Sequence, residues 1–174
     1  VTIPGNLILA AGGSIGQTNP LNSLLVNGTS SIGGNITTVN NQTYTGATTL
    51  TATDILTSNS GNILFSNTIN GAFGLTVNAL SGSTTFANTV GATTALASVT
   101  SAGTVNINGG SVRTSNFHNY QNAVVLGATT TLSSTSGGAL SFATIDSNGT
   151  PRALTLTTSA LTTLGNNIGI NSIL

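Results

Sequence analysis

Gly61-Asn62-Ile63-Leu64-Phe65 recurs further along the chain as Gly138-Ala139-Leu140-Ser141-Phe142. In both stretches a glycine is followed by apolar residues at alternate positions, which is typical of a half-buried β-strand that begins after a turn. The sequence on either side of the two stretches also matches, at a nearly constant separation of about 75–79 residues. A sequence that repeats itself at such a spacing indicates one structural unit stacked on itself.

Further matched residues define the limits of the repeat. They are Tyr44 with Tyr120, residues 75–77 with 154–156, and Ile15-Gly16 with Val90-Gly91 and Ile168-Gly169. We therefore expect one repeat array over residues 1–174, made of a partial repeat (1–13), two copies (14–88 and 89–166) and the start of another (167–174). Leu174 corresponds to Leu21 and Leu96, which both lead into more repeat sequence. We therefore expect further polypeptide or a neighbouring subunit to continue the array.

The apolar residues follow a two-residue period along most of the chain, which is the pattern of β-strands. Such pairs occur at Leu7/Leu9, Leu24/Val26, Ile63/Phe65, Leu75/Val77, Val105/Ile107, Val124/Leu126, Leu140/Phe142 and Leu154/Leu156. Gly and Asn, as in Asn27-Gly28 and Gly33-Gly34, interrupt these pairs. No window has the three- and four-residue spacing of an amphipathic helix. The sequence predicts an all-β protein.

The spacing between the apolar pairs predicts how the strands stack. Successive steps, each roughly a quarter of the long repeat, lead from Ile63 and Phe65 to Phe86, Ile107, Leu126, Phe142 and Leu161. This predicts a parallel β-helix, or β-solenoid, with rungs of about 20 residues stacked about 4.8 Å apart. The alternative is a tandem pair of Ig-like β-sandwiches, although the chain lacks their Greek-key turns and tryptophan core.

Charged residues make up 2% of the chain, namely Asp54, Asp146, Arg113 and Arg152, with His118 as the one histidine. Two cations cannot neutralise several phosphates, so we expect no binding to nucleic acid or to anionic lipid. No apolar run reaches the roughly 18 residues of a membrane-spanning helix. The chain has no Cys, which excludes disulfides and thiolate metal sites. A net charge of zero suits an assembled fibre or array better than a free monomer.

Three phrases of the chain resemble phrases of the filamentous-haemagglutinin-like giant bacterial proteins. They are residues 5–16 (GNLILAAGGSIG), residues 42–46 (QTYTG) followed by Thr49-Leu50, and residues 61–65 (GNILF). The second copy departs from the pattern, with residues 119–122 (NYQN) where the QTY phrase is expected. The resemblance implies a right-handed parallel β-helix that is secreted across the outer membrane and displayed as a surface fibre or adhesin. It also implies a host-surface or glycan receptor as a partner.

Two sets of polar residues are candidates for catalysis. His118 with Ser115 and either Asp54 or Asp146 would form a hydrolase triad. However, no nucleophile elbow surrounds a serine, and Ser115 and His118 fit a polar turn before the strand at Val124. Asp54 and Asp146 would form the carboxylate pair of a glycoside hydrolase, but they are far apart in the sequence and several rungs are expected between them. We therefore expect no catalytic residue, and we interpret the aspartates as turn residues or partners of an arginine.

The sequence offers no metal or cofactor site, since it has one histidine, no cysteine and no repeated Asp. Threonines at alternate positions, as in residues 48–53 and 153–157, leave an ice-binding face open, although threonine also commonly fills outward strand positions. Arg152 lies in a turn, residues 148–152, that is longer than its counterpart in the first copy. We interpret this turn as a simple longer loop.

The sequence therefore predicts a structural, non-catalytic segment of an extracellular fibre or adhesin of the bacterial cell surface. Its expected partners are like repeats, either in a longer covalent array or in a homopolymer. Three alternatives stay open: a filament subunit joined end to end through exposed rungs, an ice-binding solenoid and a carbohydrate-active β-helix.

Overall fold

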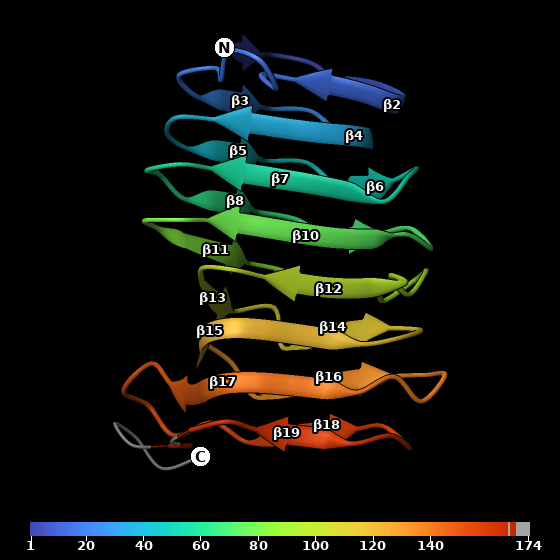
Figure 1. The fold of residues 1–174 in the computed structure, drawn as a ribbon, viewed down its shortest axis with the longest axis vertical. Coiled ribbons are helices and arrows are strands. Elements are labelled where there is room, and N and C mark those ends of the chain that lie inside the picture. The colour runs from blue at the N-terminus through green and yellow to red at the C-terminus, as the bar shows by residue number, and fades with distance from the viewer. Residues whose placement is uncertain (167, 170–174) are drawn as a thin grey trace.

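A computed structural model describes residues 1–166 and 168–169. The chain coils into a β-solenoid of about 8 turns of about 21 residues each (Figure 1). The described residues contain no helix, and hence none that is long and apolar enough to cross a membrane. As the chain descends in Figure 1, the front strands run leftwards and the rear strands rightwards, so the coil is right-handed. The predicted parallel β-helix is confirmed, and the alternative of tandem Ig-like sandwiches is wrong.

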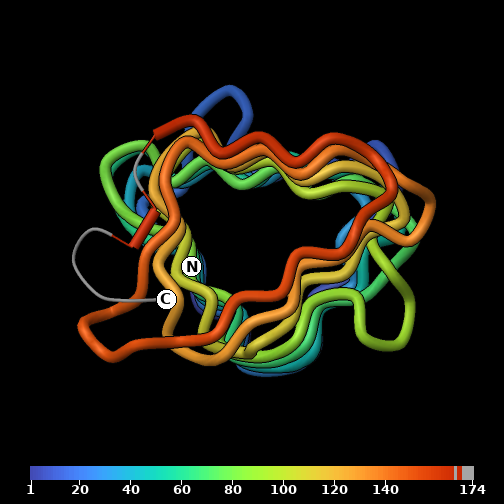
Figure 2. Tube along the Cα trace, turned by 90° about the horizontal axis from the view of Figure 1, so that it is seen from below, coloured from blue at the N-terminus to red at the C-terminus, as the bar shows by residue number. Residues whose placement is uncertain are grey.

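Each turn has three sides, and the strands of successive turns pair in parallel to form three faces (Figure 2). Face A contains β1 (Thr2–Ile3), β3 (Leu24–Val26), β5 (Gln42–Tyr44), β8 (Ile63–Phe65), β11 (Ser83–Phe86), β13 (Thr104–Ile107) and the second parts of β15 (His118–Leu126) and β17 (Leu140–Ser147). Face B contains the first parts of β2 (Leu7–Ile15) and β4 (Ser30–Thr38), then β6 (Thr48–Leu50), β9 (Ile69–Asn70), the bridge residue Val90, β14 (Ser111–Thr114), β16 (Thr130–Ser134) and β18 (Leu154–Thr157). Face C contains the second parts of β2 and β4, then β7 (Asp54–Ser58), β10 (Gly74–Ala79), β12 (Ser98–Ser101), the first parts of β15 and β17, and β19 (Thr162–Leu164).

The apolar side chains predicted to alternate along the strands fill the interior of the solenoid. On face A the rings of Tyr44, Phe65 and Phe86 lie one above another, with centroids 4.9 and 5.9 Å apart. On face C the ring of Tyr120 stacks on that of Phe142 at 5.3 Å. Burying one such side chain contributes about 1.5–3 kcal/mol. The interior columns are therefore the main source of stability, and side chains occupy the space that the trace in Figure 2 leaves open.

Glycine allows β4 to cross from face B to face C in one continuous strand. A Cβ atom on Gly34 would overlap the carbonyl oxygen of Gly13 in the turn before. Only glycine lets two backbones approach this closely. Gly33-Gly34, which the sequence suggested as an interruption between strands, therefore bends β4 without ending it.

The sequence repeat does not stack directly on itself. Its length is not a whole number of turns of about 21 residues, so equivalent residues of the two copies lie on different faces. Tyr44 lies on face A and its counterpart Tyr120 on face C, while Leu50 on face B corresponds to Leu126 on face A. Each copy is thus related to the one before it by a translation along the axis and a rotation of about a third of a turn.

This geometry corrects the predicted number of rungs in a repeat. The step from Leu126 to Phe142 is expected from the sequence to be one rung within one column. In the structure Leu126 pairs with Ser147 on face A, whereas Phe142 pairs with Tyr120 on face C. That step therefore covers only part of a turn. The rung length was predicted correctly, but the step from Leu126 to Phe142 is not a rung, so a repeat of 75–79 residues spans somewhat fewer than four turns of about 21 residues.

Two equivalent loops project from different corners of the solenoid. They follow Gly16 (φ 70°) and Gly91 (φ 73°), where a Cβ would overlap the carbonyl oxygens of Thr37 and Arg113. The loop over residues 16–21 lies between faces C and A, and the loop over residues 91–97 lies between faces B and C (Figure 2). Of the expected start of a further copy, only residues 168 and 169 lie within the described part of the chain. Leu174, on which the expected continuation of the array depends, lies outside it.

Candidate functional site

The polar side chains in the interior form two clusters of similar geometry, and the first is centred on Gln42. The Tyr44 hydroxyl donates a hydrogen bond of 2.9 Å to Gln42 Oε1. Gln42 Nε2 donates to the backbone carbonyl oxygen of Thr57 at 2.8 Å. Both Gln42 and Tyr44 are fully buried. Each of these contacts satisfies a polar group that would be costly to bury unpaired.

The second cluster is centred on His118, the counterpart of Gln42. His118 Nε2 lies 3.1 Å from the carbonyl oxygen of Ser133, and Nδ1 lies 3.3 Å from the Tyr120 hydroxyl. A carbonyl oxygen only accepts, so Nε2 carries the proton and Nδ1 accepts from Tyr120. Burial lowers the pKa of His118 to about 4, although its hydrogen bond to Ser133 opposes the shift. His118 is therefore a neutral residue of the core at pH 7.

The structure does not assemble the candidate triad around His118. Both ring nitrogens are engaged, one by Tyr120 and one by Ser133, so neither is left for Ser115 or an aspartate. His118 begins β15 and is 1% exposed. The interpretation of His118 as a residue of a polar turn is wrong. Its match in the first copy is Gln42, another polar residue whose burial only the structure shows, so the repeat alone could not have located His118.

Asp54 is buried in the interior at the start of β7, where it pairs in register with Leu75. Neither of its carboxylate oxygens has a hydrogen-bond partner among the described residues. Desolvation raises the pKa of Asp54 to about 7. Burial raises the pKa of Tyr44 well above its usual value, and the charge of Asp54 raises it further. Asp54 is therefore neither the turn residue nor the arginine partner that the sequence suggested.

Asp146 lies far from Asp54 and on another face. Asp146 lies in the part of β17 that pairs on face A, where its Oδ1 accepts a hydrogen bond from the backbone nitrogen of Ser147 at 2.8 Å. Four parallel pairings, from β7 through β10, β12 and β15 to β17, separate the two aspartates along the axis. At about 4.8 Å each these amount to about 19 Å. The carboxylates of a glycoside hydrolase lie about 5–9.5 Å apart, so the structure does not bring this pair together.

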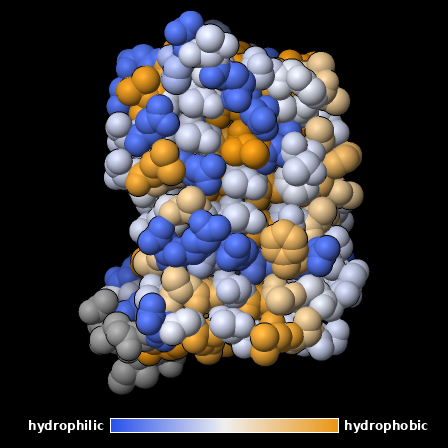
Figure 3. All heavy atoms as spheres, in the orientation of Figure 1, coloured by the Kyte–Doolittle hydropathy of each residue, from blue (hydrophilic) through white to orange (hydrophobic). Residues whose placement is uncertain are grey.

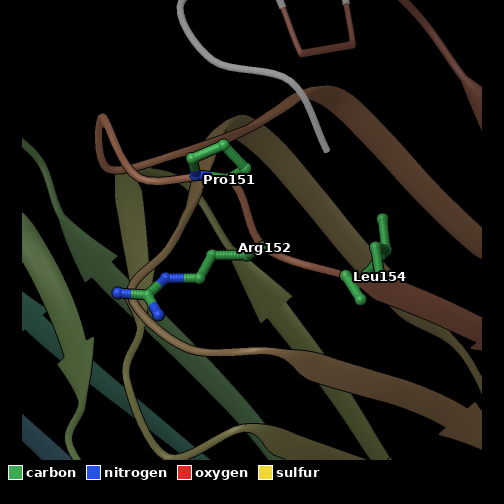
Figure 4. A pocket seen from close by; sticks show the side chains of 4 residues that line it. Pro151, Arg152 and Leu154 are labelled. Carbon is green, nitrogen blue, oxygen red and sulfur yellow. The ribbon is translucent and has the colours of Figure 1, made fainter.

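The two arginines have separate surroundings. Arg113 Nη1 donates to the carbonyl oxygens of Gly91 and Ala92, at 3.4 and 3.3 Å, and so holds the loop over residues 91–97. Arg152 lies beside an open hollow of about 490 Å³, lined by Pro151, Arg152, Ala153 and Leu154 (Figure 4). Its side chain extends away from Leu154 in that view. Among the described residues that line the hollow, the guanidinium of Arg152 has only apolar side chains beside it.

The outward threonines do not form an uninterrupted flat array. On face A, Leu64 lies between Thr43 and Thr85 in the register of adjacent strands. On face C, Asn78 donates to Thr57 Oγ1 at 3.4 Å. The surface drawn in Figure 3 accordingly mixes polar and apolar side chains. On face B, which carries the predicted stretches 48–53 and 153–157, Ser31 and Asn70 flank Thr49 in the register of adjacent strands. The ice-binding alternative therefore has no uninterrupted column of threonines at Thr49.

Among residues 1–166 and 168–169, no three His, Cys, Asp or Glu side chains come together as a metal site would require. Comparison of the chain with protein-family models, with curated proteins and with solved structures finds no match. The fold and the geometry of the described residues are therefore the basis for assigning a function. They are those of a β-solenoid repeat protein.

Proposed function

We propose that this chain is a structural, non-catalytic segment of an extracellular fibre or adhesin. The observation that carries the proposal is that buried polar side chains hydrogen-bond one face of the solenoid to another. Gln42 and His118, two buried polar side chains, each bond to a tyrosine hydroxyl and to a backbone carbonyl on another face, Thr57 of face C for Gln42 and Ser133 of face B for His118. These contacts join the sides of the solenoid to one another. Bonds of this kind between faces add to the parallel strand ladders in stiffening the rod.

The rotation between copies of the repeat supports the role of a fibre that displays binding loops on its surface. The equivalent loops after Gly16 and Gly91 leave the rod at different corners. A longer array of such copies would present this loop around its whole circumference. That arrangement suits an adhesin that meets a host surface or glycan from any direction, because no single face has to be turned towards it.

Composition supports an extracellular location at a bacterial surface. The chain has no Cys and carries 2% charged residues with a net charge of zero. Low charge removes the repulsion that keeps free proteins apart in the cytosol. The phrases that resemble those of filamentous-haemagglutinin-like proteins, which include residues 5–16, favour the same location.

The proposal is tested by locating the chain on the cells that produce it. Antibodies against the folded chain should label intact cells, and brief protease treatment of those cells should remove the label. Labelling that requires permeabilised cells would contradict an extracellular fibre. An intact chain much heavier than the 17.1 kDa of this sequence would identify a covalent array.

The second candidate is a filament subunit joined end to end. Within the described residues, β1 and β18 each pair with one strand only, and free strand edges favour association with another chain. Negative-stain microscopy of the purified chain before and after dilution separates the candidates. Filaments that dissociate into short rods on dilution would favour the subunit, whereas single rods at every concentration would favour the covalent array.

A further inference from the structure

The chain contains four Asn-Gly pairs, at residues 27–28, 70–71, 108–109 and 148–149. In such a pair the backbone nitrogen of the glycine can attack the side-chain carbonyl carbon of the asparagine, because glycine has no Cβ to obstruct it. The attack requires a backbone nitrogen that is free of other bonds and a chain able to rotate. The structure differs greatly among the four pairs in both respects.

Three of the pairs are held by the ladder of backbone hydrogen bonds that joins successive turns of the solenoid. The backbone nitrogens of Gly28, Gly71 and Gly109 donate to the carbonyl oxygens of Gly5, Thr94 and Phe86, at 3.0, 3.3 and 3.1 Å. A Cβ on any of these glycines would overlap backbone or side-chain atoms of another turn. Attack at these sites would therefore need local opening of the solenoid.

The fourth pair lies outside the ladder. Asn148 and Gly149 are both exposed, in the loop between β17 and β18. Gly149 has a φ of 88°, and nothing lies within 4 Å of the position that its Cβ would take. Its backbone nitrogen has no hydrogen bond to any described residue. The backbone nitrogen of Asn148, by contrast, donates to the carbonyl oxygen of Leu126 at 3.1 Å, which fixes the start of the loop.

We propose that Asn148 is a site of spontaneous deamidation in the folded protein. The Gly149 nitrogen loses its proton and forms a bond to Cγ of Asn148, and the side-chain amide leaves as ammonia. This yields a five-membered succinimide. Water then adds to one of its two carbonyl carbons and breaks the bond from that carbon to the ring nitrogen. The products are aspartate and isoaspartate at position 148.

The modification changes the surface and leaves the core intact. It adds one negative charge to a chain whose formal net charge is zero, in the same loop as Arg152. An isoaspartate lengthens the backbone by one carbon, which the open surroundings of Gly149 can accommodate. The same change at Asn27, Asn70 or Asn108 would break the ladder.

The test is to hold the native protein in mildly alkaline buffer and follow the four pairs by peptide mapping. The amide-to-acid mass change and the isoaspartate should accumulate at Asn148 at least about tenfold faster than at the other three, since those depend on local opening. In urea, which removes the ladder, the four rates should converge. Asn148→Gln should abolish the native-state reaction, while the matched variant Asn108→Gln should leave it unchanged.

Two results would overturn the proposal. One is equal or faster conversion at Asn27, Asn70 or Asn108 in the native protein. The other is no conversion at Asn148 over a period in which the urea-unfolded chain reacts. Neither result would touch the proposed function, because the fibre assignment does not depend on this loop.

Discussion

His118 on face C forms the same two contacts that Gln42 forms on face A. Each side chain bonds to the hydroxyl of the tyrosine two residues later and to the carbonyl oxygen of the residue fifteen later. The two residues occupy equivalent positions in the two copies of the repeat and lie about a third of a turn apart around the axis. The first copy therefore provides the natural control for a substitution in the second.

We predict that His118→Gln removes an acid-sensitive contribution to the stability of the protein. The pKa of His118 falls from 6.5 to about 4 on folding, so its contribution to stability is complete above pH 6.5 and is lost as the pH falls towards 4. The loss amounts to about 3 kcal/mol. Urea unfolding at a series of pH values should show that the free energy of unfolding of the wild type, taken relative to that of the variant, falls by this amount between pH 6.5 and 4.

The control for that experiment is His118→Ala. It also removes the titrating group, but it leaves Tyr120 and the Ser133 carbonyl without their partner, so it should destabilise the protein by about 1–3 kcal/mol at every pH. If the His118→Gln and His118→Ala variants lost the same amount of stability, the structural equivalence of His118 and Gln42 would be wrong.

We predict that Asp54→Thr stabilises the protein at pH 7. The pKa of Asp54 rises from 3.8 to about 7 on folding, so the folded state loses stability relative to the unfolded state as the pH rises from 3.8 to 7. The total is up to about 4 kcal/mol. Threonine is the residue at the equivalent position, Thr130, where its hydroxyl donates to the Ala128 carbonyl oxygen at 2.8 Å. Asp146→Asn, at a partly exposed site, should change stability by about 0.5 kcal/mol or less, and a larger gain there than at Asp54 would contradict this account.

His118 and Asp54 should have opposite effects on the pH dependence of stability in the wild-type protein. Between pH 4 and 6.5, His118 makes stability rise with pH while Asp54 makes it fall. Each contributes about 1.4 kcal/mol per pH unit where fully active, so their sum should be nearly flat. Stability should fall with rising pH in His118→Gln and rise with it in Asp54→Thr. Parallel pH profiles for the two variants would show that the groups do not titrate as the structure indicates.

We predict that Gly34→Ala destabilises the solenoid and that Gly5→Ala does not. The new methyl at position 34 would overlap the Gly13 carbonyl oxygen, whereas at position 5 nothing lies within 4 Å. Overpacking of this kind costs about 1–3 kcal/mol or more, and an exposed change costs about 0.5 kcal/mol or less. Midpoints of chemical unfolding measure both, and similar midpoints would contradict the close approach of the two turns.

The sequence predicted the strands well because their signal is local. Pairs such as Leu75/Val77 alternate within β10, and this period survives in any β-fold. The assignment of strands to faces failed at Leu126 and Phe142, because a step across part of a turn and a step around a whole turn look alike in the sequence. They differ only in how many corners the chain turns between them.

The interior polar residues could not be located from composition. His118 and Asp54 belong to types that are mostly found at surfaces or only partly buried, and their burial depends on facing inwards at the start of a strand. Comparison of the two copies matches His118 with Gln42 and Asp54 with Thr130, all of them polar residues, so it predicts neither burial. The unpaired carboxylate is therefore visible only in the structure.

The strands stack in a three-sided coil through which the repeat rotates by about a third of a turn. The absence of native cysteines allows a direct test by oxidative cross-linking of cysteine pairs. Val125 is adjacent to Asp146, and Asn119 is adjacent to Ser141, so cysteines at either pair should form a disulfide. A cysteine at Val125 paired with one at Ser141 should not. A disulfide between positions 125 and 141, and none between 125 and 146, would restore four rungs per repeat and contradict the account.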